Sequence, residues 1–174
     1  MKEDGSRGVG DGAAILSQEA ERWGALYERL RPNLVRALAA AAGSYDGVED
    51  AIQDAFVAAL ANAPEDLRSP EAWLFVVGLN KLRKQQRRSR LAARLRLVRP
   101  PGPHELDDAL NRADVLTTLQ QLSSRERTLL VAKYYVGLTQ EELATHLRIP
   151  RGTVSSAVSR AAAHFRDLER TAGG

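Results

Sequence analysis

The sequence predicts an all-α protein of two small helical domains joined by a flexible linker, with a helix-turn-helix in the C-terminal domain. Apolar residues make up 44% of the 174-residue chain and aromatic residues only 5%, which is typical of helical proteins with modest core side chains. Apolar residues recur mainly at three- and four-residue spacings, the period of amphipathic helices. Residues 100–103 read Pro-Pro-Gly-Pro, a helix-incompatible run that separates two helical parts.

The N-terminal domain is predicted to cover residues 15–90. Residues 1–14 are rich in glycine and charge and bury too little to offset their ordering entropy, so we expect a disordered tail. A helix is expected from about Ser17, with apolar residues at helical spacing: Trp23, Leu26, Tyr27, Leu30, Leu34 and Leu38. Pro32 inside this run predicts a kink or a split into two helices, and Gly43 fits a C-terminal cap.

A second amphipathic helix is expected over Val48 to about Ala61. Its apolar face comprises Ile52, Ala55, Phe56, Ala59 and Leu60. Its other face forms an acidic patch of Glu49, Asp50, Gln53 and Asp54. Acids early in a helix suit the helix dipole, which explains Glu49 and Asp50 but explains Gln53 and Asp54 less well.

The third helix is expected to begin at Pro70, after a polar loop over residues 62–69. Trp73, Val76, Val77 and Asn80 share one of its faces, with Trp73 expected in the core and Asn80 in need of a partner. Residues 81–99 then hold nine basic residues and no acidic one in 19 positions. A solvated face normally mixes charges, so this run favours phosphate contact over a plain solubilising linker.

Residues 91–107 are expected to form a basic, proline-rich linker, and residues 108–170 the C-terminal domain. Its first helix carries Leu110, Val115, Leu116, Leu119 and Leu122 at helical spacing. Ser123 and Glu126 have the spacing of a capping box. The helix after them is expected to bury Leu129, Leu130 and Tyr134 and to end at Gly137.

Residues 138–165 read as two short helices joined by a tight turn. Thr139 and Glu142 form a second capping box, and Ile149 before Pro150 ends the first helix near Leu147. In the second helix Val154, Val158, Ala161 and Phe165 are expected to be buried, opposite a polar, partly cationic face. Such a face suits insertion into a DNA major groove, although an ordinary αα-hairpin with a solvated face is the alternative.

Composition excludes several other classes. The net charge is only +3, so affinity for a polyanion must come from local clustering. The chain has no cysteine, which rules out disulfides and thiolate metal sites. We find no signal peptide and no apolar run near the roughly 20 residues of a membrane span, so a cytoplasmic protein without membrane contact is expected.

Neither an enzyme nor a response regulator fits the sequence. The three histidines lie far apart without carboxylates at ligand spacing, and no phosphate loop or nucleophile elbow appears. We therefore expect no catalytic residue, metal or cofactor. A response regulator ends in a similar helix-turn-helix but begins with alternating strands and helices, whereas residues 17–90 show only helical periodicity.

The segments together resemble a bacterial sigma factor of the extracytoplasmic-function (ECF) type, over about Trp23 to Leu168. Region 2 of that family is similar to LYERLRPNLVRAL, VEDAIQDAFVAAL and PEAWLFVVGLNKLRKQQRR, in that order. Region 4 is similar to LQQLSSRERTLLVAKYYVGLTQEELATHLRIPRGTVSSAVSRA. Each segment alone is moderately specific, but their joint order within so short a chain is highly specific.

The resemblance implies a factor that binds core RNA polymerase and directs initiation at specific promoters. Its polymerase contacts would be the β′ clamp helices, for Glu49, Asp50, Gln53 and Asp54, and the β flap, for region 4. Contacts to the −10 element would come from Asn62, Asn80, Lys81, Arg83, Lys84, Arg87 and Arg88. Contacts to the −35 element would come from Arg151, Thr153, Ser155, Ser156, Ser159 and Arg160. An anti-sigma factor is a candidate partner on the resemblance alone.

The sequence departs from the family pattern around the recognition helix. Arg148 fills a turn position that is usually glycine, where a left-handed backbone costs another residue about 1 kcal/mol. Pro150 replaces a common serine cap, and Ser155 and Ala157 replace a lysine and an arginine. Two fewer cations predict weaker binding of the −35 element with a flatter salt dependence. A sigma-like regulator or decoy that does not initiate transcription is the alternative.

Overall fold

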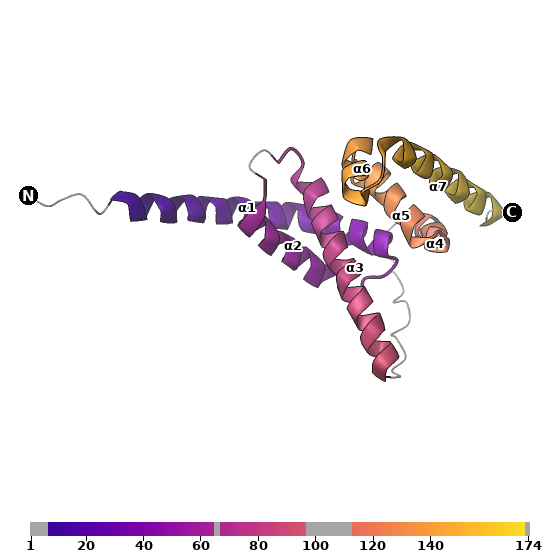
Figure 1. Ribbon diagram of the computed structural model, residues 1–174, viewed down its shortest axis with the longest axis horizontal. Helices are drawn as coiled ribbons and strands as arrows, with labels where there is room; N and C mark the ends of the chain where they lie inside the picture. The colour runs from indigo at the N-terminus through magenta and orange to yellow at the C-terminus, as the bar shows by residue number, and fades with distance from the viewer. Residues whose placement is uncertain (1–6, 65–66, 97–112, 173–174) are drawn as a thin grey trace, which may run out of the picture.

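The computed structural model describes residues 7–64, 67–96 and 113–172, and these residues form helices and short turns, with no strand among them. The N-terminal half holds α1 (Arg7–Ala42), α2 (Val48–Asn62) and α3 (Pro70–Arg96). The C-terminal half holds α4 (Ala113–Gln121), α5 (Ser124–Leu130), the π-helical turn η1 (Val131–Tyr135), α6 (Gln140–Leu147) and α7 (Arg151–Ala172). Figure 1 shows the N-terminal part of α1 and the C-terminal part of α3 projecting from the packed helices. Within the described residues, no helix is long and apolar enough to cross a membrane.

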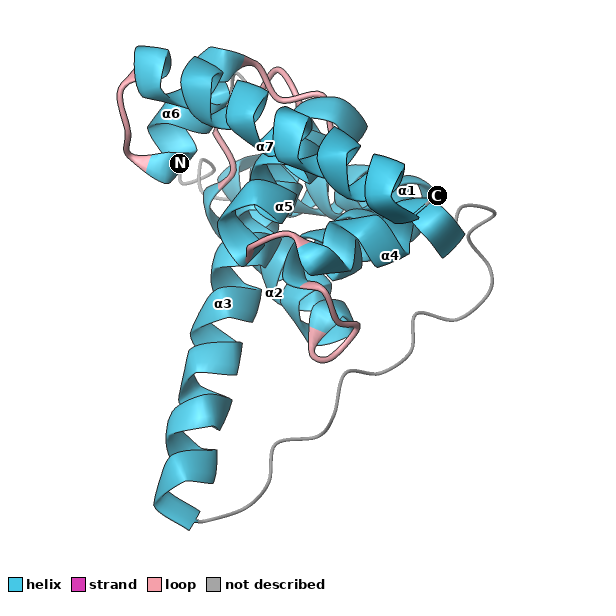
Figure 2. Cartoon of the chain, turned by 90° about the vertical axis from the view of Figure 1, so that its right-hand side faces the viewer, coloured by secondary structure: helices cyan, strands magenta, loops and turns pink. Residues whose placement is uncertain are grey.

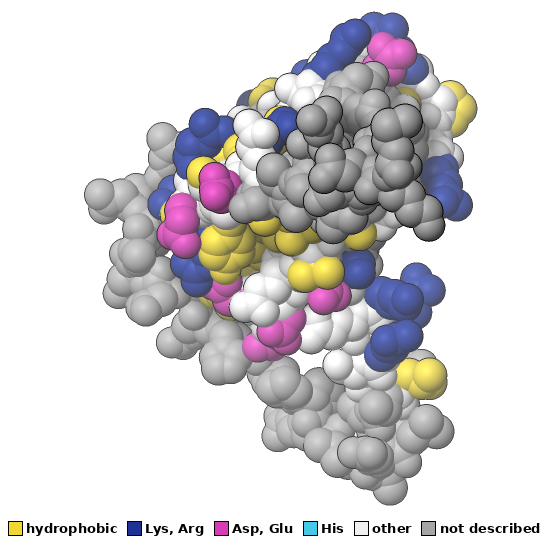
Figure 3. Space-filling view, turned by 90° about the vertical axis from the view of Figure 1, so that its left-hand side faces the viewer, with side chains coloured by type: hydrophobic (Ala, Val, Ile, Leu, Met, Phe, Trp, Pro, Cys, Tyr) yellow, Lys and Arg dark blue, Asp and Glu magenta, His cyan; other side chains and the backbone are white. Residues whose placement is uncertain are grey.

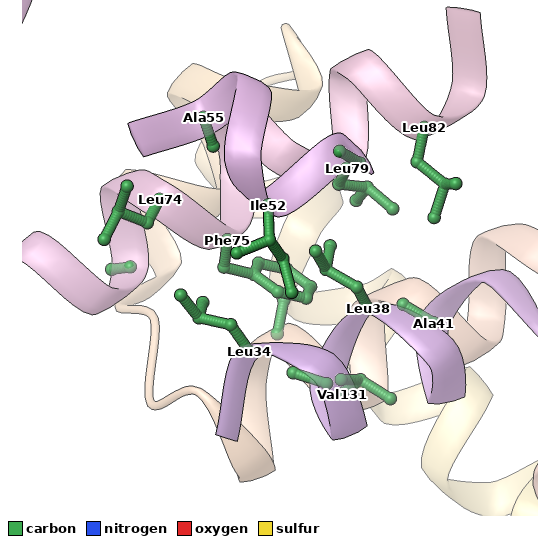
Figure 4. Packing of buried hydrophobic residues seen from close by; sticks show 14 of the residues in the cluster. Leu34, Leu38, Ala41, Ile52, Ala55, Leu74, Phe75, Leu79, Leu82 and Val131 are labelled. Atoms are coloured by element: carbon green, nitrogen blue, oxygen red, sulfur yellow. The ribbon is translucent and has the colours of Figure 1, made fainter. Parts of the chain in front are cut away.

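The first three helices pack around a common apolar core (Figure 4). Its fully buried side chains include Leu34, Leu38, Ile52, Leu74 and Phe75. At its edge, Trp23 and Tyr27 make edge-to-face contacts with Phe56, with ring centroids 6.2 and 5.0 Å apart. These contacts hold α1 against α2.

Helix α1 differs from the prediction at two places. It begins at Arg7, so residues 7–14, which the sequence predicts to be disordered, continue the helix, while residues 1–6 lie outside the described residues. Once a helix is nucleated, each further residue adds a hydrogen bond for the backbone that it fixes. Pro32 does not divide α1 into two helices. Because Pro32 is exposed, its ring is accommodated by solvent and the helix loses one backbone hydrogen bond there.

The buried face of α3 also differs from the prediction. Leu74, Phe75, Leu79 and Leu82 are buried, whereas Trp73, Val76 and Val77 are only partly buried and Asn80 is exposed. The run from Trp73 to Leu79 is apolar on every side, so periodicity alone does not fix which stripe faces the core. The helix also continues to Arg96, through the start of the predicted linker; the remaining linker residues 97–107 lie outside the described residues.

The two halves pack against each other, because α1 contacts α4, α5 and η1 as well as α2 and α3 (Figure 2). One apolar cluster spans both halves and includes Leu34 and Leu38 of α1, Val131 of η1 and Val154 of α7. A smaller cluster of Leu122, Leu130 and Ala161 closes the C-terminal half, with Phe165 partly buried beside it. The predicted burial of Tyr134 is wrong, because its side chain is 67% exposed on η1.

Candidate nucleic-acid interface

The C-terminal helix pair α6–α7 has the backbone geometry that the sequence predicts. The Thr139 N–H donates to Glu142 Oε2 over 2.7 Å, and the Glu142 N–H donates to Thr139 Oγ1 over 3.2 Å, which completes the capping box. The hydrogen bond from the Thr139 backbone lowers the pKa of Glu142. Helix α6 ends at Leu147, and Arg148 is left-handed with φ 54° and ψ 45°. The Pro150 carbonyl accepts the first hydrogen bonds of α7.

The outward face of α7 carries the predicted −35 contacts. Arg151, Thr153, Ser156, Ser159 and Arg160 are exposed, and the buried residues behind them are Val154, Val158 and Ala161.

Ser155 departs from this pattern because it is half-buried and accepts a hydrogen bond from Gln140 Nε2 over 3.5 Å. Its side chain therefore turns partly toward α6. The face presented to solvent is polar, with a cation at Arg151 and another at Arg160.

The acidic patch of α2 divides into paired and free parts. Arg31 of α1 donates from Nε to Glu49 Oε2 over 3.2 Å and makes a second bond from Nη2 to Glu49 Oε1. The Coulombic attraction of Glu49 raises the pKa of Arg31. Asp54 lies 3.7 Å from Lys81 Nζ of α3, with both side chains largely in solvent, and Asp50 and Gln53 are exposed.

Two apolar side chains extend this exposed stripe of α2. Val57 is 64% exposed and Leu60 52% exposed, although the sequence assigns Leu60 to the buried face. Asp50, Asp54 and Val57 follow one another at four- and three-residue spacing, and this helical spacing is the signal that places Val57 beside the acids. Figure 3 shows acidic side chains near exposed apolar ones, with Lys and Arg gathered at the edge of the same view.

The predicted −10 contacts lie along the end of α2 and the exposed side of α3. Asn62, Asn80, Lys81, Lys84, Arg87 and Arg88 are exposed. Arg83 is different, because it is half-buried and its Nη2 donates to Thr128 Oγ1 of α5 over 2.9 Å. Burial lowers the pKa of Arg83. The structure thus presents most of this cationic set to solvent and holds Arg83 against the C-terminal half.

No group of three or more metal-ligating side chains occurs among the described residues. The surface chemistry consists instead of carboxylates beside apolar side chains on α2, cations on α3, and hydroxyls beside Arg151 and Arg160 on the outward face of α7. Cations and hydroxyls of this kind bind phosphates and base edges, and an acidic surface with apolar side chains beside it suits a cationic protein partner.

Comparison with known proteins identifies both halves. Residues 26–91 match the family model "Sigma-70 region 2" and residues 118–167 match "Sigma-70, region 4". The ECF RNA polymerase sigma factor SigL of Mycobacterium tuberculosis is 30% identical over 154 residues, which cover 83% of this chain and 86% of SigL. The RNA polymerase sigma factor NccH of Alcaligenes xylosoxydans is 32% identical over 151 residues, covering 76% of this chain and 81% of NccH.

Two solved structures have a similar fold. The sigma factor RpoE in complex with the anti-sigma factor NepR from Bartonella quintana superposes with a TM-score of 0.68 at 24% identity, covering 86% of this chain and 98% of that one. CnrH in complex with the cytosolic domain of CnrY superposes with a TM-score of 0.62 at 31% identity, covering 91% and 94%. The chain therefore belongs to the ECF sigma factors of bacterial RNA polymerase.

Proposed function

We propose that this chain binds core RNA polymerase in the cytoplasm and directs it to one class of promoters, as an initiation factor rather than an enzyme. The observation that carries the proposal is the joint order, on one chain, of an acidic helix α2, a basic helix α3 and the helix pair α6–α7, each with its charged face in solvent. Region 2 recognises and melts the −10 element, and region 4 reads the −35 element.

Polymerase docking rests on the exposed stripe of α2. Asp50, Gln53 and Asp54 supply charge and hydrogen-bonding groups for the β′ clamp helices, and Val57 and Leu60 supply apolar area beside them. Charge complementarity sets orientation and association rate, while the apolar side chains slow dissociation once water is excluded. Glu49 is the fourth proposed contact; its pairing with Arg31 orients the carboxylate and holds α1 against α2, while 46% of its side chain stays in solvent.

Binding of the −10 element rests on the cations of α3 and the amides beside them. The family resemblance assigns the loop after α2 to the capture of a base flipped from the non-template strand of the −10 element. Asn62 ends α2 just before this loop, and Asn80 of α3 helps to hold that strand. Lys81, Lys84, Arg87 and Arg88 contact its phosphates. Backbone-tracking cations suit single-stranded DNA, whose affinity is dominated by phosphate contacts.

Reading of the −35 element rests on α7. Arg151 and Arg160 contact phosphates, and Thr153, Ser156 and Ser159 reach base edges, with Ser155 contributing from its position against α6. The same region contacts the β flap. Few cations suffice because docking on polymerase raises the effective concentration of promoter DNA at α7.

An anti-sigma factor is a further proposed partner, because the solved relatives RpoE and CnrH are each bound to another protein, NepR and CnrY. The experiment that tests the proposed function is transcription reconstituted from core polymerase, this chain and a candidate promoter. We expect a promoter-dependent transcript that is absent without the chain. Failure of the chain to bind core together with absence of the transcript refutes the function.

A further inference from the structure

Three exposed arginines form a straight stripe along α1. Arg22, Arg29 and Arg36 recur every seven residues, and all three are exposed. Seven residues are nearly two helical turns, so each step rotates the stripe by only about 20°. At about 1.5 Å per residue, neighbouring Cα atoms of the stripe are about 10.5 Å apart and its whole length is about 21 Å. These three residues are the arginine stripe of α1.

The core fixes the direction in which the arginine stripe points. The residue after each arginine is buried, namely Trp23, Leu30 and Ala37. Rotation of α1 would expose these apolar side chains to water, which is unfavourable. At Gly78 of α3 an added Cβ would lie 3.0 Å from Leu38 Cδ1, so α1 and α3 approach each other closely. The stripe therefore has a fixed position relative to α3, which carries the proposed −10 cations.

The charge of the arginine stripe is not compensated within the described part of the chain. Arg31 of the same helix pairs with Glu49, whereas none of the three stripe arginines has a carboxylate partner among the described residues. Arg36 donates from Nη1 to Asn33 Oδ1 over 3.5 Å. Because this amide is neutral, the guanidinium keeps its full charge for a partner.

The exposed acids of α1 lie beside the arginine stripe and not within it. Glu21 and Glu28 are exposed, and each precedes a stripe arginine by one position, about 100° around the helix. Side chains three or four residues apart are neighbours on a helix, and at these spacings the stripe has one acid, Glu19, three residues before Arg22. Helix α1 thus separates its exposed positive and negative charges onto different faces.

An anionic partner with little apolar surface fits the arginine stripe. Five large apolar side chains are exposed in the described part of the chain: Val57, Leu60, Leu91, Tyr134 and Tyr135. None of these five lies on α1. Protein interfaces are held by apolar or aromatic side chains in a desolvated centre, and the stripe offers none. Arginine binds phosphate through its planar fork of donors, so the chemistry favours the backbone of a nucleic acid.

The length of the arginine stripe favours a single strand over a duplex. A duplex completes one turn in about 34–36 Å, so the phosphates of one strand pass to its far side within about 17 Å. The stripe, at about 21 Å, is longer than this half-turn. A flexible single strand can follow the whole stripe, since three nucleotides at a stacked spacing of about 3.4 Å match the distance of about 10.5 Å between neighbouring arginines.

We propose that the arginine stripe of α1 binds phosphates of the single-stranded DNA that promoter melting exposes. It adds a third DNA contact to those proposed on α3 and α7, on a helix that packs directly against α3. The inference rests on the proposed melting of the −10 element. The contact is independent of base sequence, because phosphate contacts position a strand without reading it.

Two variants of the full-length chain test the arginine stripe. The neutral variant carries Arg22→Gln, Arg29→Gln and Arg36→Gln. The swapped variant carries Glu21→Arg, Arg22→Glu, Glu28→Arg and Arg29→Glu, which keeps the net charge but moves two arginines off the stripe. Arg31→Gln, which removes the paired arginine of the same helix, is the control. The positions changed in the two variants are exposed, and circular dichroism at 222 nm confirms that helicity is kept.

The first readout is fluorescence anisotropy of a labelled random-sequence single-stranded 20-mer across a salt series. The neutral variant should flatten the salt slope by about 2.1 and the swapped variant by about 1.4, at about 0.7 per phosphate contact. Arg31→Gln should keep the parent slope. A parent slope in the swapped variant means that net charge alone sets the affinity, and overturns the stripe. A larger loss on duplex DNA, about 2.7 at about 0.9 per contact, overturns the choice of a single strand.

The second readout is transcription with core polymerase, in the assay that tests the proposed function. Both variants should bind core like the parent, and the neutral variant should lose its transcript at lower salt than the parent. Weaker core binding by the neutral variant, with an unchanged salt slope on single strands, assigns the stripe to a protein partner and overturns the proposal. A parent chain that gives no transcript refutes the proposed function instead, and the slopes of the first readout then decide strand binding separately.

Discussion

The two DNA-reading helices differ in how they are built for their task. From Lys81 to Arg99 the segment that begins in α3 carries nine basic residues without an acid, whereas the outward face of α7 offers Arg151 and Arg160 among hydroxyls. By contrast, the frame of α7 is tightly specified by the capping box before α6 and the buried Val154, Val158 and Ala161. On the proposed function, electrostatic affinity for DNA lies mainly in region 2. Region 4 is then a well-positioned but weakly charged reader that depends on the binding of region 2 to polymerase.

The largest effect should follow from disrupting the docking of α2 on core polymerase. Asp50→Arg with Asp54→Arg reverses the charge of the exposed stripe of α2, so core binding should be abolished, with loss of more than about 3 kcal/mol from two reversed contacts. Sedimentation with core polymerase measures this. Glu19→Arg with Glu21→Arg, an exposed acidic pair on α1 outside both matched regions, is the control and should bind normally. Unchanged core affinity in the α2 variant would refute the docking role.

The second-largest effect should follow from changing the number of cations on α3 and α7, which tests the difference in their salt dependence. Lys84→Ala, Arg87→Ala and Arg88→Ala together should flatten the salt slope for single-stranded DNA by about 2, at about 0.7 per phosphate contact. Adding cations to α7, as Ser155→Lys with Ala157→Arg, should steepen the slope for duplex DNA by about 1.8, at about 0.9 each. Fluorescence anisotropy across a salt series measures both slopes. If the affinity of the parent chain for duplex DNA depends on salt as steeply as its affinity for single-stranded DNA, the contrast between α7 and α3 is wrong.

The turn before α7 should gain stability from glycine. Arg148 is the one non-glycine residue with positive φ among the described residues, so Arg148→Gly relieves a left-handed backbone worth about 1 kcal/mol. Thermal unfolding should shift upward by a few degrees. Arg125→Gly, which places the same residue in the first turn of α5 where φ is helical, should be destabilising. A lower melting temperature in Arg148→Gly would contradict the claim that the left-handed backbone at Arg148 is strained.

The smallest effect should appear at acid pH in the capping box of α5. Hydrogen bonds from Ser123 and His164 lower the pKa of Glu126 from 4.5 to about 2. Because the folded-state pKa is depressed, the stabilisation is present above pH 4.5 and is lost as the pH falls from 4.5 toward 2. Glu126→Gln should flatten the stability profile in that window, measured by urea unfolding. Glu169→Gln, an exposed acid on α7, is the control and should keep the parent profile.

Features set by neighbouring residues were predictable from the sequence. Both capping boxes and the end of α6 at Leu147 are confirmed, because a side chain three residues from its partner, or the proline after Ile149, determines each of them locally. The left-handed backbone at Arg148, expected from the family resemblance, is also confirmed. The order of the sigma regions is confirmed by the family matches. The roles of individual DNA- and polymerase-binding residues stay predictions.

Features set by distant contacts were not predictable. Arg127 meets carbonyls 85 and 86 residues away, and Glu49 meets Arg31 from another helix; neither spacing leaves a pattern in the sequence. The core-facing stripe of α3 was predicted wrongly because the run around Phe75 is apolar on both faces. Leu60 was placed in the core for a related reason, since it lies at the boundary between the two faces of α2.

The central claim is that transcription depends more on docking of α2 on polymerase than on the cations of α7, and the most direct test is a transcription assay. Core polymerase with the parent chain, with the Asp50→Arg and Asp54→Arg variant, and with the Arg151→Ala and Arg160→Ala variant is assayed on one responsive promoter. We predict loss of the transcript in the α2 variant and a reduced but promoter-dependent transcript in the α7 variant. A transcript that survives reversal of the α2 acids but disappears with the two α7 arginines would contradict the account.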